Sequence, residues 1–489
     1  MRSIAGRQRL STARDVLAVF TGLATASSRR IGVFCECRYK STGSAFPGKV
    51  KLGDKTYQKD SWFNVPDSIA TSIDRQLHTT NDHPISITRS IVESKFPAPA
   101  FKHYHDFFPV VSTHENFDSL GFPADHPGRS KTDTYYVNET TVLRTHTSAH
   151  ELEIFQAKES DGYTISADVY RRDAIDKTHY PIFHQMEGAR LWDREKVAHG
   201  DIAKAVWEDV ERLPKHHMIV EDPNPPTHPE RNPLQAGHAP EEAAAIATHL
   251  KRSLELMVVE IFSRAKAAAM ATNPNYHDEP LKVRWVEAYF PWTSPSWELE
   301  IYWQDQWLEV LGSGVVQQEL LQKAGVPSKL GWAFGLGLER IAMLLFEIPD
   351  IRLFWSQDPR FLSQFTGVSD DLDTLKRFIP FSKYPACYKD VAFWLPPASS
   401  STTSAAGGLA PPQAFHENDI MEIVRNIGGD NVEDVQLTDE FTHPVSGRRS
   451  LCYRINYRSL ERTLTNEEAN RFHERVRGEL VKKMAVELR

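Results

Sequence analysis

Cysteine is scarce in this chain of 489 residues. It has four cysteines, which form no CxxC pair and no credible disulfide framework. Long hydrophobic runs are also missing, so no segment is expected to span a membrane. The net charge of −8 excludes a protein that binds nucleic acid through the electrostatic field of the whole molecule. The length allows two to four globular domains.

Acidic residues are almost absent from the first 34 residues, where six arginines face the single acid Asp15. Serine and threonine are scattered between the arginines, and the stretch "RDVLAVFTGLA" fits a short amphipathic helix. This composition is typical of a mitochondrial transit peptide. We therefore expect residues 1–45 to be a presequence and the protein to act in the mitochondrial matrix. A disordered basic tail is the alternative.

Metal-binding patterns are weak despite 20 histidines. His103 and His105 stand two residues apart, and no third ligand follows at a recognisable spacing. A structural zinc site is therefore not predicted.

The segment 178–188, "THYPIFHQMEG", carries several polar groups among apolar ones. Read at period two, it places Gln185 and Glu187 on one strand face and Ile182, His184 and Met186 on the other. The two polar side chains then lie about 7 Å apart, a suitable distance for holding a small positively charged group. An edge strand with a solvated face is the alternative reading.

The segment 331–355, "GWAFGLGLERIAMLLFEIPDIRLFW", begins as a glycine-containing strand and continues as an apolar helix. Gly335 and Gly337 suggest a dinucleotide fingerprint, but Arg340 occupies the position of its third glycine, so we reject that reading. A cation in the first helical turn opposes the helix dipole unless an anion is nearby. Arg340 is therefore interpreted as a phosphate ligand.

The segment "TISADVYRRD" is predicted to be a strand that pairs antiparallel with the strand after it. Arg171, near its end, then faces the same space as Gln185 and Glu187. A buried arginine is costly without an anionic partner. Two arginines beside an amine-binding pair indicate a substrate set of an amino acid and a nucleotide.

These segments resemble a known family. "YRRDAIDKTHYPIFHQMEG" and "GWAFGLGLERIAMLLFEIPDIRLFW" are similar to motifs 2 and 3 of the phenylalanine-specific class II aminoacyl-tRNA synthetases. "SITRSIVESKF" with "DFFPVVSTHENFDSL" resembles the looser motif 1, and "LRTHTSAHE" and "YFPWTSPSWELEI" resemble two further segments of that family. The tail "SLCYRINYRSLERTLTNEEANRFHERV" resembles the anticodon-binding domain of single-chain mitochondrial members. The resemblance runs from about residue 55 to the end, except near 193–245 and 399–412.

The resemblance implies an α+β fold. An antiparallel sheet flanked by helices would form the class II catalytic domain over 46–362, with a polar insertion at about 193–245. A linker at 363–379 would lead to a ferredoxin-like anticodon-binding domain over 380–489. Because both parts share one chain, the resemblance implies a monomer.

The resemblance also implies roles for individual residues. Arg171 contacts the α-phosphate of ATP, Arg340 the γ-phosphate, and His179 the pyrophosphate side. Glu309 matches the glutamate that approaches ATP and its Mg²⁺. Gln185 and Glu187 bind the ammonium group of phenylalanine. The other amino-acid-binding positions are Thr147, Ser148, His150 and an apolar slot of Phe290, Trp292, Ala333 and Phe334.

Two features of these positions carry their own expectations. The run "SAHE" fits a capping box between Ser148 and Glu151, so Ser148 has a structural role as an alternative or in addition. Trp292 departs from the family, which usually has phenylalanine there, and the larger indole either narrows the slot or turns aside.

The implied activity is attachment of phenylalanine to mitochondrial tRNA(Phe) through a phenylalanyl-adenylate, with ATP, Mg²⁺, phenylalanine and the tRNA as partners. The alternative is a catalytically inactive, synthetase-like RNA-binding protein. Such a protein would be expected to lose Arg171, Arg340 or the Gln185–Glu187 pair, and all of them are present.

Overall fold

The structure is a computed structural model that describes residues 48–272, 280–303, 306–381, 384–396 and 415–489. The expected presequence and the stretch 399–412 lie outside the described residues. None of the helices within those ranges is long and apolar enough to cross a membrane.

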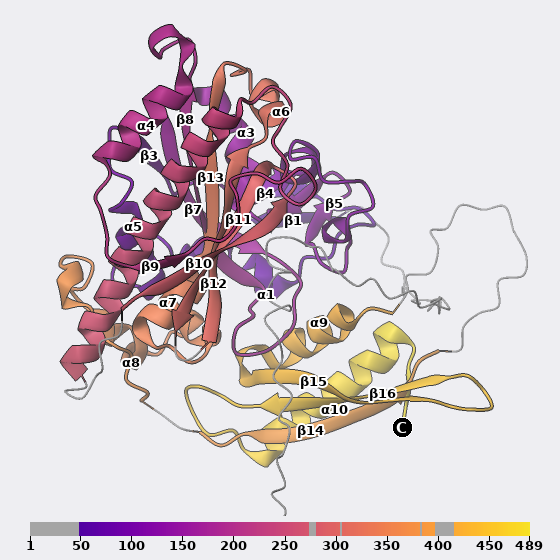
Figure 1. The fold of residues 1–489 in the computed structure, drawn as a ribbon. Coiled ribbons are helices and arrows are strands. Elements are labelled where there is room, and N and C mark those ends of the chain that lie inside the picture. Colours follow the sequence, from indigo (N-terminus) through magenta and orange to yellow (C-terminus); the bar gives the residue numbers. More distant parts are fainter. Residues whose placement is uncertain (1–47, 273–279, 304–305, 382–383, 397–414) are drawn as a thin grey trace, which may run out of the picture.

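An eight-stranded sheet organises the larger domain (Figure 1). Its strand order is β3-β7-β8-β13-β12-β11-β10-β9. Only the two edge strands pair in parallel, so the predicted antiparallel sheet is confirmed for its centre. The strands are β3 Phe101–Tyr104, β7 Gly162–Tyr170, β8 Ile182–Asp193, β9 Ile219–Glu221, β10 Lys282–Phe290, β11 Thr293–Trp303, β12 Gln306–Val316 and β13 Lys329–Gly337.

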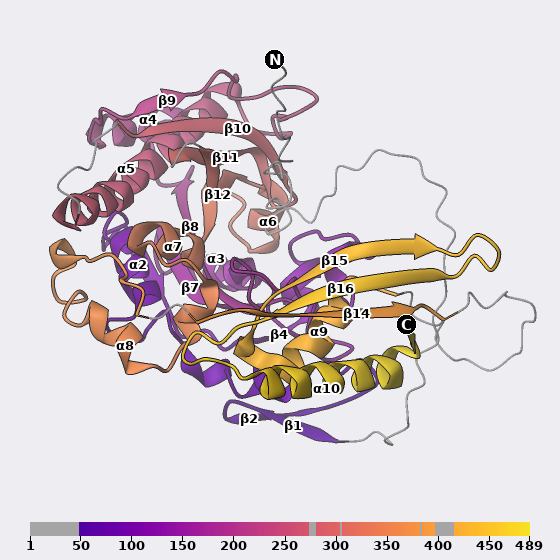
Figure 2. The same ribbon diagram turned by 90° about the horizontal axis from the view of Figure 1, so that it is seen from below.

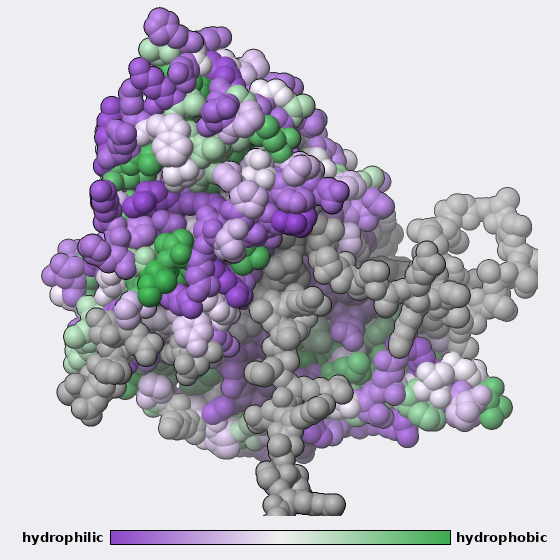
Figure 3. Space-filling model, viewed as in Figure 1, coloured by the Kyte–Doolittle hydropathy of each residue, from purple (hydrophilic) through white to green (hydrophobic). Residues whose placement is uncertain are grey.

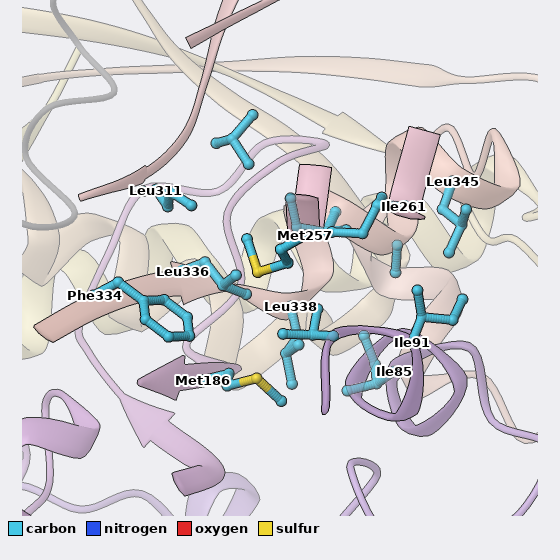
Figure 4. Packing of buried hydrophobic residues seen from close by; sticks show 14 of the residues in the cluster. Ile85, Ile91, Met186, Met257, Ile261, Leu311, Phe334, Leu336, Leu338 and Leu345 are labelled. Carbon is cyan, nitrogen blue, oxygen red and sulfur yellow. The ribbon is translucent and has the colours of Figure 1, made fainter. Parts of the chain in front are cut away.

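Helices cover one face of this sheet and bury the main core against it (Figure 4). The core helices are α2 Pro84–Glu93, α5 Pro240–Thr272 and α7 Leu338–Phe346. Apolar side chains on these helices, such as Ile91, Met257 and Leu345, belong to one buried core with Met186 and Leu336 of the sheet. This packing fixes where α7 begins relative to β8 and β13.

Shorter elements complete the larger domain. The range 193–245 is not loop throughout, because it contains α4, which packs against α5, and β9. The remaining helices and strands are α1 Asp67–Ala70, α3 Glu151–Ala157, α4 Ile202–Arg212, α6 Gln318–Lys323, α8 Pro359–Leu362, β1 Lys49–Leu52, β2 Lys55–Gln58, β4 Val110–Ser112, β5 Tyr136–Asn138 and β6 Thr141–Leu143. The surface in Figure 3 is mostly hydrophilic, and its hydrophobic areas are small and separate.

The alternation predicted for β8 is confirmed. Ile182 and Met186 belong to the core under the helices, and His184 on the same face contacts α7. Gln185 and Glu187 therefore point to the opposite face of the sheet. The strand begins at Ile182, so the first four residues of "THYPIFHQMEG", His179 among them, lie in the loop before it.

A second, four-stranded sheet with its own core forms the C-terminal domain. Its order, β15-β16-β14-β17, is antiparallel throughout. Figure 2 shows both helices on one face of this sheet, the arrangement of the predicted ferredoxin-like domain. The elements are β14 Cys387–Trp394, α9 Glu417–Gly428, β15 Val432–Thr442, β16 Arg449–Tyr457, α10 Asn466–Met484 and β17 Glu487–Leu488.

The loop between β7 and β8 joins the two domains. Ile175 in this loop is buried in the core of the C-terminal domain, where its carbonyl accepts a hydrogen bond from Val435 N–H (3.1 Å). Tyr180 donates its hydroxyl to Asp430 (2.9 Å). The loop that carries His179 is thus also a contact surface for the C-terminal domain.

Candidate active site

Arg171 stands where β7 ends and the loop begins. The β7–β8 ladder places Tyr170 opposite Ile182, and Arg171 N–H donates to the carbonyl of Pro181 (3.0 Å). The Nε of Arg171 donates to the Thr145 carbonyl (2.8 Å), and its guanidinium lies over the Phe183 ring at 5.4 Å. Burial lowers the pKa of Arg171 to about 10, so the group stays cationic at neutral pH. A guanidinium that is held in place and charged at neutral pH is suited to bind a phosphate group.

Glu187 and Gln185 meet a short 3₁₀ helix, Thr147–His150. Ser148 Oγ donates to Glu187 Oε1 (2.7 Å), and Thr147 N–H donates to Gln185 Oε1 (3.3 Å). Burial raises the pKa of Glu187 to about 7, although the Ser148 hydroxyl opposes that rise. A carboxyl group in this state gains from an incoming cation, because the cation stabilises its charged form.

The predicted capping box between Ser148 and Glu151 is wrong. Helix α3 begins only at Glu151, after the 3₁₀ turn, and no side-chain cap bond is made at its start. The Ser148 hydroxyl is turned to Glu187. The Ser148 hydroxyl therefore donates to Glu187 on β8 and does not cap α3.

A cavity adjoins Glu187 and is walled by aromatic and small side chains. Its lining includes all four residues of the predicted slot, namely Phe290, Trp292, Ala333 and Phe334. The Trp292 indole stacks on His146 (ring centroids 5.9 Å apart, 27°) and on Phe290 (6.2 Å, 28°). The indole therefore forms an aromatic wall of the slot, held by its neighbours.

Glycines in the sheet make room for two of these rings. A Cβ at Gly312 would lie 2.5 Å from Phe290 Cζ, and one at Gly188 would lie 2.6 Å from Phe334 Cε1. The Phe334 ring, however, stacks on Phe96 (5.2 Å, 23°) in the core under the helices. Because neighbouring strand residues face opposite sides, the Ala333 side chain is the one that β13 presents to the site.

His150 does not join the wall of this cavity. Its Nδ1 is hydrogen-bonded to Glu153 Oε1 (2.5 Å), its Nε2 accepts from Arg144 Nη1 (3.0 Å), and its ring stacks on Phe107 at 4.4 Å. The expected contact with the amino acid is therefore not supported, because the 3₁₀ turn directs this side chain toward Arg144.

Sequence reasoning missed two cavity residues with titratable side chains. Glu151 and Tyr163 both line the cavity. Burial raises the pKa of each, and Glu151 Oε1 has no hydrogen-bond partner among the described residues. The alternation of faces along β7 could have identified Tyr163, because Tyr163 and Arg171 are an even number of residues apart and lie on the same face. No comparable signal marks Glu151.

Arg340 lies in the first turn of α7, as predicted. Its Nη1 donates to the Glu309 carbonyl on β12 (3.3 Å). Burial raises the pKa of Glu309 to about 7, with Arg340 opposing the rise, and raises that of nearby Glu298 to about 8. Within the described ranges, no three metal-ligating side chains lie close enough to hold a metal ion.

His179 lies beside a cavity of about 660 Å³ between the two domains. Its Nδ1 is hydrogen-bonded to Asp176 Oδ2 (2.7 Å). Burial acts to lower the pKa of His179, but the bond to Asp176 and the charge of Asp173 outweigh burial and raise it. The imidazole is thus biased toward the cationic form.

The pair His103 and His105 is accounted for by hydrogen bonds. His103 Nδ1 bonds with Thr164 Oγ1 (2.7 Å), and His105 Nε2 bonds with Glu93 Oε1 (2.6 Å). These contacts need no metal ion.

Comparisons with known proteins identify the family of the chain. A family model described as "tRNA synthetases class II core domain (F)" matches residues 68–211 and 248–365, and "Ferredoxin-fold anticodon binding domain" matches 382–489. The mitochondrial phenylalanine--tRNA ligase of Saccharomyces cerevisiae is 50% identical over 461 residues, covering 90% of this chain and 95% of that protein. The chain belongs to the phenylalanine--tRNA ligase family.

Other phenylalanine--tRNA ligases are similar over nearly their whole length. The mitochondrial protein of Mus musculus is 40% identical, covering 90% of this chain and 89% of that protein. The chloroplastic/mitochondrial protein of Arabidopsis thaliana is 40% identical, covering 92% and 89%. The predicted family, fold class and ligase activity are thereby confirmed. An inactive RNA-binding protein is not favoured.

Proposed function

We propose that this site activates phenylalanine with ATP and passes it to mitochondrial tRNA(Phe), in the mitochondrial matrix. The observation that carries the assignment is the Ser148–Glu187 hydrogen bond beside an aromatic cavity that Glu187 lines, with Arg171 nearby. An aromatic slot lined by a carboxyl group suits an amino acid with an aromatic side chain.

Phenylalanine's ammonium group binds Glu187 and the amide oxygen of Gln185. Glu187 binds it in the charged form, with Ser148 Oγ–H supporting that charge. The amide nitrogen of Gln185 is buried and has no hydrogen-bond partner among the described residues. It is therefore available to donate to the substrate carboxylate. The substrate ring occupies the slot between Phe290, Trp292 and Ala333.

ATP lies on the side of Arg171 and Arg340. A carboxylate oxygen of phenylalanine attacks the α-phosphorus of ATP, and the bond from that phosphorus to the bridging oxygen of pyrophosphate breaks. Arg171 neutralises the charge that develops on the α-phosphate, while Arg340 and the cationic form of His179 hold the β- and γ-phosphates. Since the carboxylate is already ionised, no side chain acts as a base, and catalysis consists of alignment and charge stabilisation.

Magnesium fits this chemistry as a companion of ATP. Burial raises the pKa of Glu309 and Glu298, and mutual repulsion adds to the rise in Glu298, so a nearby cation would lower both values. Because these carboxylates do not converge as a complete ligand set, phosphate oxygens of ATP would supply the remaining ligands. The ion would neutralise phosphate charge, and Glu309 would be its ligand from this chain.

The enzyme works as a monomer. The edge strands of the large sheet, β3 and β9, have four and three residues. Tyr104 and Lys102 of β3 are hydrogen-bonded to Glu159, which adds charge at that edge. Short, charged edge strands disfavour pairing with a second copy.

The deciding experiment measures ATP–pyrophosphate exchange with each amino acid of a panel in turn. Charging of mitochondrial tRNA(Phe) is then measured with the amino acid that supports exchange. Exchange with phenylalanine alone, and charging of that tRNA, is the expected result. Exchange with a different amino acid, or tRNA binding without exchange, would contradict the proposal. Sedimentation of active protein at about twice the chain mass of 55.6 kDa would contradict the monomer.

A further inference from the structure

A buried histidine and glutamate join the two segments that carry the proposed site. His184 precedes Gln185 on β8, and Glu339 precedes Arg340 on α7. Their side chains are 0% and 4% exposed. Neither residue lines the amino-acid cavity, whereas each directly precedes a residue of the proposed site.

The Glu339 carboxylate accepts a hydrogen bond from the backbone of β8 just beyond the last residue pair between β8 and β13. Pairing between β8 and β13 ends where Gln185 faces Gly337, because the chain turns into α7 at Leu338. One residue before Gln185 on β8, the His184 N–H donates to Glu339 Oε2 (2.7 Å). The ring Nδ1 of His184 is hydrogen-bonded to Glu339 Oε1 (2.7 Å). A carboxylate only accepts, so the ring carries its proton on Nδ1.

The His184 ring is itself held on its faces. It stacks on Trp355 (6.0 Å, 22°) and lies 5.3 Å from the His78 ring. Both carboxylate oxygens of Glu339 thus link the first turn of α7 to β8 through a packed imidazole. Removing one of these bonds releases that turn without removing any group that touches substrate.

Arg340 depends on that turn for its orientation. Among the described residues its guanidinium donates to the Glu309 carbonyl, and the 3.3 Å distance from Nη1 is long for a charged donor. We propose that Glu339 is a positioning residue: through His184 it sets the guanidinium of Arg340 against the phosphates of ATP. This inference rests on the proposed function, which assigns ATP to Arg340.

The competing explanation is that the pair stabilises the fold and nothing more. Glu339→Gln keeps the size of the side chain and one acceptor oxygen but removes the other. The matched control is Glu255→Gln on α5. Glu255 also forms a buried pair with a histidine, His216 (2.8 Å; side chains 9% and 8% exposed), and its second oxygen accepts from Trp285 Nε1 (3.0 Å). Within the described part of the chain, the hydrogen bonds and ion pairs of Glu255 and His216 involve none of the proposed site residues.

Pyrophosphate exchange and thermal melting would be measured on the full chain and both variants. Both substitutions are expected to lower Tm. Only Glu339→Gln should raise the KM for ATP or lower kcat, by about tenfold to a hundredfold, the usual cost of misplacing a group that aligns substrates. The Kd of phenylalanine should stay within about twofold of wild type in both, because the ammonium site is not displaced.

A double-mutant cycle separates positioning from general damage. If Glu339 acts through Arg340, adding Glu339→Gln to Arg340→Ala should cause little further loss of exchange. Multiplicative losses would overturn the proposal, as would wild-type ATP kinetics in folded Glu339→Gln. Absence of exchange in the wild-type protein would instead refute the proposed function itself.

A second pair of variants keeps the test open if Glu339→Gln does not fold. His184→Asn places an amide N–H close to the position of Nδ1–H, whereas His184→Ala removes that donor. Retention of ATP kinetics in His184→Asn together with their loss in His184→Ala is expected. Equal ATP kinetics in the two variants would contradict the positioning role.

Discussion

Binding of phenylalanine should weaken as the pH falls, because Glu187 must be ionised to hold the ammonium group. Burial raises the pKa of Glu187 to about 7 in the empty site. The ammonium of free phenylalanine is protonated at and below neutral pH, so within that range Glu187 controls the charge complementarity. If only the ionised form binds, the apparent Kd at pH 6 should be about tenfold weaker than at pH 8, with most of the change below pH 7.

Equilibrium dialysis or calorimetry with phenylalanine alone, between pH 6 and 8, measures this directly. The Kd of ATP without phenylalanine serves as the internal reference, since Glu187 lies outside the phosphate side of the site. Glu187→Gln should bind phenylalanine weakly and with no pH dependence, because the amide does not titrate. A flat Kd in the wild-type protein, or the same slope in Glu187→Gln, would refute the assignment of Glu187 as the ammonium ligand.

Three further substitutions test the neighbouring roles. Ser148→Ala removes the donor that holds the pKa of Glu187 down, so the midpoint of the phenylalanine Kd profile should move to higher pH; an unmoved midpoint would contradict this. Arg171→Ala should depress adenylate formation far more than phenylalanine binding, because its partner charge develops in the transition state; equal losses in KM and kcat would contradict that role. Ala333→Gly should admit para-substituted phenylalanines such as p-chlorophenylalanine in pyrophosphate exchange, since Ala333 lines the slot; a uniform loss for all substrates would mean that glycine has only loosened the strand.

The sequence by itself determined which residues of β8 are buried and which face the proposed site. Alternation in "THYPIFHQMEG" separates Ile182 and Met186, which need burial, from Gln185 and Glu187, which need a polar partner. The hydrophobic effect sets these faces from the local sequence, because a register slip by one residue would expose all the apolar side chains of the strand. The glycine-containing strand that leads into an apolar helix likewise placed Arg340 in the first turn of α7, as the structure has it.

Only the tertiary structure decided what the polar side chains contact. "SAHE" satisfies the local pattern of a capping box, yet Ser148 bonds with Glu187, which lies 39 residues further along the chain. His150 stands two residues from Ser148 but turns to Arg144, because a 3₁₀ turn, and not an α-helix, carries both. A local sequence pattern cannot tell whether a hydroxyl group bonds to a neighbour in the chain or to an acceptor that folding brings close.

The same limit applies to Trp292 and Glu339. The sequence left open whether the indole narrows the slot or turns aside, and its stacking on His146 and Phe290 decided that it forms a wall. The pairing of Glu339 with His184 joins residues 155 positions apart. Such contacts depend on how α7 packs against β8, and that packing is set by the whole core and not by any one segment.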